Sequence, residues 1–175
     1  LPSKVCTVTL YIALYKGLKT TTDKVISTAL SVRHRTITKY SHVELLVERP
    51  YFVDLASNTL AQTTIAASKR DGKQVRCKEP LIFKPGNWDF VSLPISKDRY
   101  GLSLDIWEEA STRVGIRYDT LGAVLCVTPF ARLKLDAEWC SAMIADICDW
   151  DEPEKYDPYM VGQKALQIGG EFFKR

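Results

Sequence analysis

The first half of the chain alternates apolar residues with polar or small ones, which is the period of a β-strand. The clearest segment covers residues 5–16, is rich in β-branched side chains and ends before Gly17. Arg49 and Pro50 separate two later runs, so we expect a hairpin that turns at this pair. Residues 58–73 are small and polar and predict no element. The predicted strands are 5–16, 41–48, 51–55, 75–77, 81–84 and 88–93.

Apolar residues at helical spacing mark the second half and one earlier segment. The earlier helix begins at the run Thr20 to Asp23, whose side chains can cap it, and should stop by Arg35. Gly115 ends the first of the later helices, and Asp136 is placed to cap the third. The later helices are predicted at 102–114, 118–127, 138–150 and 158–168. Strands first and helices after predict one α+β domain over residues 1–175.

Composition and charge exclude several classes of protein. Hydrophobic residues make up 46% of the chain, which is enough for a single core. The 24 basic and 21 acidic residues are scattered, so we expect no nucleic-acid partner. No run reaches the roughly 18 apolar residues of a membrane span, and the first apolar run lacks a cleavage site for a signal peptide. We therefore expect a soluble protein.

The cysteines favour neither a disulfide framework nor a metal site. Their number is odd, and no two of them form a CxxC pair. Only two histidines are present to complete a zinc site. We therefore expect a reducing compartment and neither a metal nor a cofactor. The five cysteines are Cys6, Cys77, Cys126, Cys140 and Cys148.

Cys140 differs from the other cysteines because it falls in the first turn of a predicted helix. The free N–H groups and the positive end of a helix stabilise a thiolate, and the same N–H groups can hold an oxyanion. A thiolate nucleophile also needs a proton carrier, usually a histidine. His42 begins a predicted strand that could aim it, whereas His34 lies between two arginines and has the pattern of a solvated helix end. We therefore choose His42.

A set of short motifs resembles a known superfamily when it is taken in chain order. Histidine precedes cysteine in this order, as in the circularly permuted branch of the NlpC/P60 papain-like superfamily, which includes YiiX-like and phage-encoded proteins. The chain resembles that branch over most of its length. The motifs are YSHVEL at 40–45, SKRDG at 68–72, VR at 75–76, WDFVSLP at 88–94, GIRYD at 115–119 and WCSA at 139–142.

The resemblance implies a permuted papain-like fold, in which an antiparallel sheet from the N-terminal half packs against helices of the C-terminal half. It implies that Cys140 is the nucleophile and His42 the general base. Tyr118 matches the tyrosine of the superfamily's Gly-x-x-Tyr motif, and with Ser141 it is expected on the substrate or oxyanion side.

The third catalytic residue is expected on the strand after His42, where such enzymes place a polar side chain that orients the imidazole. A two-residue turn at Arg49 and Pro50 would set Ser57 opposite His42, while a turn longer by one residue would favour Asp54. Asp54 and Ser57 stay open as alternatives, with Ser68 as a further candidate.

The expected function is that of a thiol hydrolase that cleaves an amide bond, and the resemblance points to peptidoglycan peptides as substrates. A phage-encoded protein of this kind would act in the host cytoplasm or as part of the virion, among virion proteins. Two alternatives stay open. One is a non-catalytic interaction or virion domain on the same fold. The other is a lipid- or acyl-directed hydrolase or acyltransferase, with a groove formed by Leu121, Val124, Leu125 and Val127.

Overall fold

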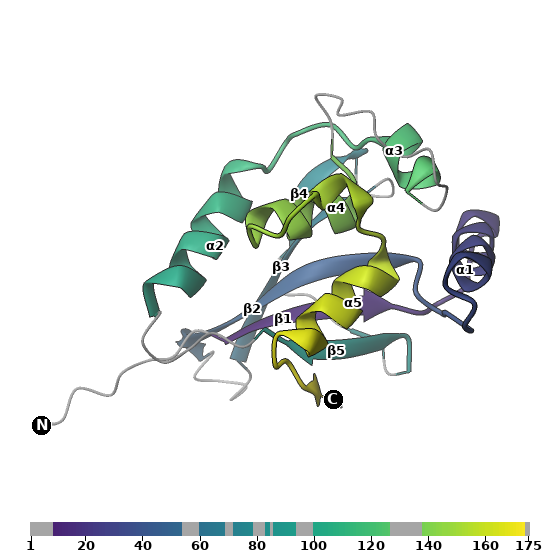
Figure 1. The fold of residues 1–175 in the computed structure, drawn as a ribbon. Coiled ribbons are helices and arrows are strands. Elements are labelled where there is room, and N and C mark those ends of the chain that lie inside the picture. The colour runs from purple at the N-terminus through teal and green to yellow at the C-terminus, as the bar shows by residue number, and fades with distance from the viewer. Residues whose placement is uncertain are drawn as a thin grey trace, which may run out of the picture.

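The computed structural model describes residues 9–53, 60–68, 72–78, 83–84, 86–93, 100–126 and 138–173. Within these residues the protein has an α+β fold, as predicted. Six strands form one antiparallel sheet in the order β4-β3-β2-β1-β5-β6. Figure 1 shows most of the helices of the C-terminal half on one face of this sheet. The strands are β1 Thr9–Tyr15, β2 His42–Val53, β3 Leu60–Ser68, β4 Gln74–Lys78, β5 Trp88–Ser92 and β6 Phe172–Phe173.

The predicted hairpin at Arg49 and Pro50 is wrong. Strand β2 runs through both residues, and it pairs with β3 in a register that matches Leu45 with Ile65. The register shifts between Glu48 and Val53, so the strand accommodates the proline at an irregularity of the pairing. The strand that follows β2 in the chain and pairs with it, β3, is therefore one that the sequence pattern did not predict.

Strand β3 was not predicted because most of its side chains are small, alanine, serine or threonine, and large apolar residues do not alternate along it. In the structure the described side chains of this strand are all buried, from Thr63 to Ser68. The strand lies between β2 and β4, in the interior of the sheet. Its small residues leave room for longer side chains on the neighbouring strands.

The helices begin and end close to their predicted bounds. Thr20 and Asp23 form a capping box at the start of the first helix, and Arg35 closes it in the left-handed conformation. Asp136 lies outside the described residues. The helices are α1 Thr21–His34, α2 Tyr100–Thr112, α3 Thr120–Leu125, α4 Cys140–Ile147 and α5 Pro158–Gln167, with a 3₁₀ turn at Pro153–Lys155.

The two faces of the sheet differ in what covers them. One face carries large apolar residues such as Leu14, Leu45 and Val91, which form the main core with side chains of α2, α4 and α5. The other face carries the alternate positions, among them Ala13, Leu46 and Phe90, which form a second and smaller cluster. His42 and Glu44 share the strand parity of Leu46, so they belong to this second face.

The sequence pattern predicted that His34 is a solvated helix end, and this prediction is wrong. Its Nε2 atom lies 2.7 Å from Oδ2 of Asp157, and its ring packs against Tyr159. Asp157 is fully buried, and its Oδ1 atom accepts a hydrogen bond from the N–H of Met160 at the start of α5. One carboxylate thus caps α5 and fastens it to the end of α1.

Replacing Asp157 with alanine should lower the free energy of unfolding by about 2 to 4 kcal/mol, because the helix cap and a charge-assisted hydrogen bond are lost together. Asp157→Asn keeps a capping oxygen and should lose less. Urea denaturation followed by tryptophan fluorescence measures both. Asp105→Ala, on the exposed side of α2, is the control and should change stability little. Equal losses for Asp157→Ala and Asp105→Ala would contradict this role.

Candidate active site

His42 is the first residue of β2, so its ring lies at one end of the sheet. Strand alternation places Glu44, two residues further on, on the same face. The Nε2 atom of His42 lies 3.3 Å from Oε1 of Glu44. Since Glu44 takes Nε2, the ring nitrogen that remains for a second partner is Nδ1.

Glu44 is held from its other side by Arg76 on β4. A guanidinium nitrogen of Arg76 donates to Oε1 of Glu44 at 2.7 Å. Strand β3 lies between the two residues, and the small buried Ala66, which pairs with Arg76, allows the long side chain to cross it. Glu44 is only 2% exposed. Its buried carboxylate therefore depends on the two side chains that contact it, His42 and Arg76.

Cys140 is the first residue of α4. The residue before it, Trp139, takes the N-cap position without a side-chain hydrogen bond to the helix. The first turn of α4 therefore has no capping side chain that would compete with a reacting group for its N–H groups. A thiolate and a developing oxyanion are both stabilised at such a position.

The structure brings His42 and Cys140 together. Burial alone would lower the pKa of His42, but the charge of Cys140 and a hydrogen bond to it, with a smaller contribution from Glu44, raise the pKa to about 10. For Glu44 the effect of burial has the opposite sign, because burial alone would raise the pKa of a carboxyl group. His42 and Arg76 nevertheless hold the pKa of Glu44 below its usual value. The arrangement therefore favours the charged, imidazolium form of His42.

Tyr118 is the third residue beside the thiol. Its N–H donates to the carbonyl of Lys73, and its backbone forms a bridge with Glu138, two residues before Cys140. Burial raises the pKa of Tyr118, and the neighbouring Cys140, Cys126 and Asp119 raise it further. The phenol thus stays protonated and is able to donate a hydrogen bond near the thiol.

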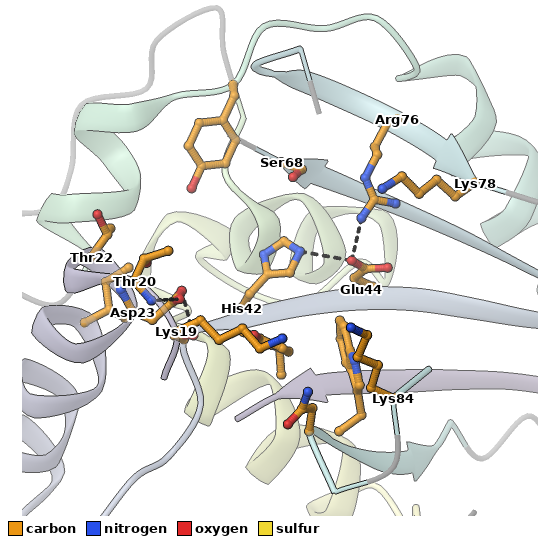
Figure 2. A pocket seen from close by; sticks show the side chains of 16 residues that line it. Lys19, Thr20, Thr22, Asp23, His42, Glu44, Ser68, Arg76, Lys78 and Lys84 are labelled. Atoms are coloured by element: carbon orange, nitrogen blue, oxygen red, sulfur yellow. Dashed lines mark hydrogen bonds and ion pairs between the residues drawn. The ribbon is translucent and has the colours of Figure 1, made fainter. Parts of the chain in front are cut away.

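A cleft of about 670 Å³ opens in front of His42. Figure 2 shows the His42 ring facing this space, with the start of α1 on one side and Arg76 and Lys78 on the other. The residues that line the cleft are Tyr15, Lys19, Thr20, Thr22, Asp23, Ile26, Ser41, His42, Glu44, Ser68, Arg76, Lys78, Lys84, Asn87, Trp88 and Tyr118.

Cys140 itself is 4% exposed and is not among the lining residues. Its two neighbours, His42 and Tyr118, do line the cleft. The cleft therefore extends as far as two side chains that lie beside the thiol. A carbonyl group that approaches Cys140 from the cleft would contact both of them.

The structure treats the other predicted site residues differently. Asp54 and Ser57 lie outside the described residues. Ser68 lines the cleft, and the register of β2 with β3, extended toward the start of β2, places it opposite His42. Ser141 is fully buried, and its hydroxyl donates to the carbonyl of Tyr156 at 2.8 Å, so it ties α4 to a later loop.

Glu44 and Arg76 are not among the site residues expected from the sequence. Glu44 could have been found, because a residue two positions after a strand histidine shares its face. Arg76 could not, because its distance from Glu44 depends on the pairing of β3 with both neighbours. The carboxylate that contacts the imidazole therefore comes from the histidine's own strand, whereas the sequence led us to expect a polar residue on the next strand.

The described residues contain no group of three or more His, Cys, Asp or Glu side chains that could hold a metal ion. In the same part of the chain, no helix is long and apolar enough to cross a membrane. Comparison of the chain with family models, curated proteins and solved structures found no match.

The raised pKa of His42 gives a direct measurement. In a proton NMR titration, the His42 C2–H signal should change with a midpoint near pH 10, since the imidazolium is stabilised by Cys140 and Glu44. Cys140→Ala or Glu44→Gln should lower the midpoint, because each removes a negative partner. His42→Gln assigns the signal, because His34 is the other histidine. A midpoint near 6.5 in all three proteins would contradict the pairing.

Proposed function

We propose that this protein is a thiol hydrolase with Cys140 as nucleophile, His42 as general base and Glu44 as the residue that orients the imidazole. The observation that carries the proposal is the pairing of His42 with the thiol of a cysteine at the start of α4. A nucleophile, a base beside it and a third group that orients the base are the three parts that this chemistry requires.

In the proposed reaction, His42 accepts the thiol proton and the thiolate attacks a carbonyl carbon. The oxyanion that forms is stabilised by the N–H of Cys140 and the hydroxyl of Tyr118. His42 then returns the proton to the leaving group, and a thioester remains on Cys140. His42 next removes a proton from water, which attacks the thioester and releases the acid and the thiol.

Glu44 and Arg76 act on this reaction through His42. The carboxylate fixes the ring by its bond to Nε2, so Nδ1 is directed toward the thiol. Arg76 in turn fixes the carboxylate. Because the chain of contacts crosses three strands, the ring keeps its position without help from the substrate.

We further propose that the fold is the permuted papain-like one and that the substrate bond is an amide of peptidoglycan peptides. The support is the order of His42 before Cys140, the antiparallel sheet packed against later helices, and the sequence motifs that resemble the NlpC/P60 superfamily. The groove suggested for an acyl chain gains no support, since Leu121 and Leu125 do not line the cleft.

Alkylation of Cys140 by iodoacetamide tests the proposed pair. At pH 6.5 wild-type Cys140 should react about tenfold or more faster than in His42→Ala, because an isolated thiol, with a pKa of about 8.5, is protonated there. Peptide mass spectrometry resolves Cys140 from the exposed Cys77, which serves as internal reference. His34→Ala is the matched control and should react like wild type. Equal rates with and without His42 would leave the non-catalytic domain as the better explanation.

Activity is tested on purified peptidoglycan and, in parallel, on a panel of acyl esters. Release of new amino groups from peptidoglycan by wild type, and none by Cys140→Ala, is the expected result. Ester cleavage without release from peptidoglycan would replace the amide substrate by an acyl one, while the thiol mechanism would stand.

A further inference from the structure

The charges that line the cleft are unbalanced. Among the described residues that line it, four lysines and arginines face two carboxylates. Glu44 is already engaged by Arg76 and His42. The remaining carboxylate belongs to Asp23, which accepts hydrogen bonds from the backbone of Thr20 and from the hydroxyl of Ser41. The cleft therefore has an excess of positive charge.

Two of the lysines come from opposite sides of the cleft. Lys19 precedes the capping residue of α1, and Lys84 lies just before β5. Neither has an ion-pair partner among the residues that the structure describes. In Figure 2 the Lys19 side chain extends from the side of α1 to a place below His42 in the view. Lys84 lies at the lower right, below Glu44.

We propose that Lys19 and Lys84 form an anion-binding subsite that selects substrates with a carboxylate or phosphate group close to the bond that is cut. This inference rests on the proposed thiol hydrolase and adds the charge of its substrate. The ammonium groups of two lysines can bind an anion as point charges on flexible side chains. They do not require the fixed, planar geometry with which an arginine binds a carboxylate or phosphate. Both lysines line the same cleft as His42, so an anion held there also places the neighbouring carbonyl near Cys140.

The charge of the alkylating reagent tests the subsite. Iodoacetate carries a carboxylate and iodoacetamide is its neutral counterpart, so the ratio of their rates at Cys140 reports the attraction of an anion. At low ionic strength Lys19→Gln/Lys84→Gln should lower this ratio by about three- to tenfold and leave the iodoacetamide rate unchanged. The control Lys24→Gln/Lys39→Gln removes the same charge from exposed positions outside the cleft and should leave the ratio unchanged.

An unchanged ratio in Lys19→Gln/Lys84→Gln, with a reactive and His42-dependent thiol, would overturn the subsite and leave the hydrolase intact. An equal fall in the control variant would also overturn it, because the effect would then come from net charge alone. A thiol that resists both reagents would contradict the hydrolase, and the subsite would then be decided by direct binding.

Direct binding is measured by titrating inorganic phosphate or acetate into the Cys140→Ala protein and following the His42 C2–H signal. A saturable shift of this signal supports the subsite if it disappears when Lys19→Gln and Lys84→Gln are added to the Cys140→Ala protein. A response to phosphate alone assigns a phosphoryl group, and a response to acetate alone assigns a carboxylate. No response to either anion would overturn the proposal.

Discussion

The buried carboxylate of Glu44 is the group on which the arrangement of the site depends. Removing a carboxylate from water is costly, and partners of opposite charge have to offset that cost. Arg76 and His42 are those partners, and they lie on β4 and on β2 itself. The requirement therefore fixes both the ring of His42 and the crossing of Arg76 over β3.

The sheet separates the core from the site. Its helix-covered face is filled by large apolar side chains, while the opposite face has alanines on both sides of Glu44, at Ala13 and Ala66. These small residues make room for the side chains of Glu44 and Arg76 on this face. Cys140 belongs to the helix-covered core but reaches His42 at the end of the sheet where β2 begins.

The cleft and the thiol have different surroundings. Cys140 is only 4% exposed and lies beside His42 and Tyr118, while the cleft that these two residues line also carries Lys19, Lys78 and Lys84. A thiol with so little exposed surface is shielded from bulk water. A positively charged outer cleft would in turn concentrate anionic molecules near it.

The sequence by itself determined the bounds of the helices, the capping of α1 at Thr20, and the placement of Cys140 in the first turn of a helix, because each depends on local spacing. It did not determine β3, whose mostly small residues show no regular alternation, or the partner of Glu44. Those depend on which strands pair and in which register. Only the tertiary structure could bring Arg76 to Glu44 and His42 to Cys140, since residues far apart in the chain meet there through the sheet.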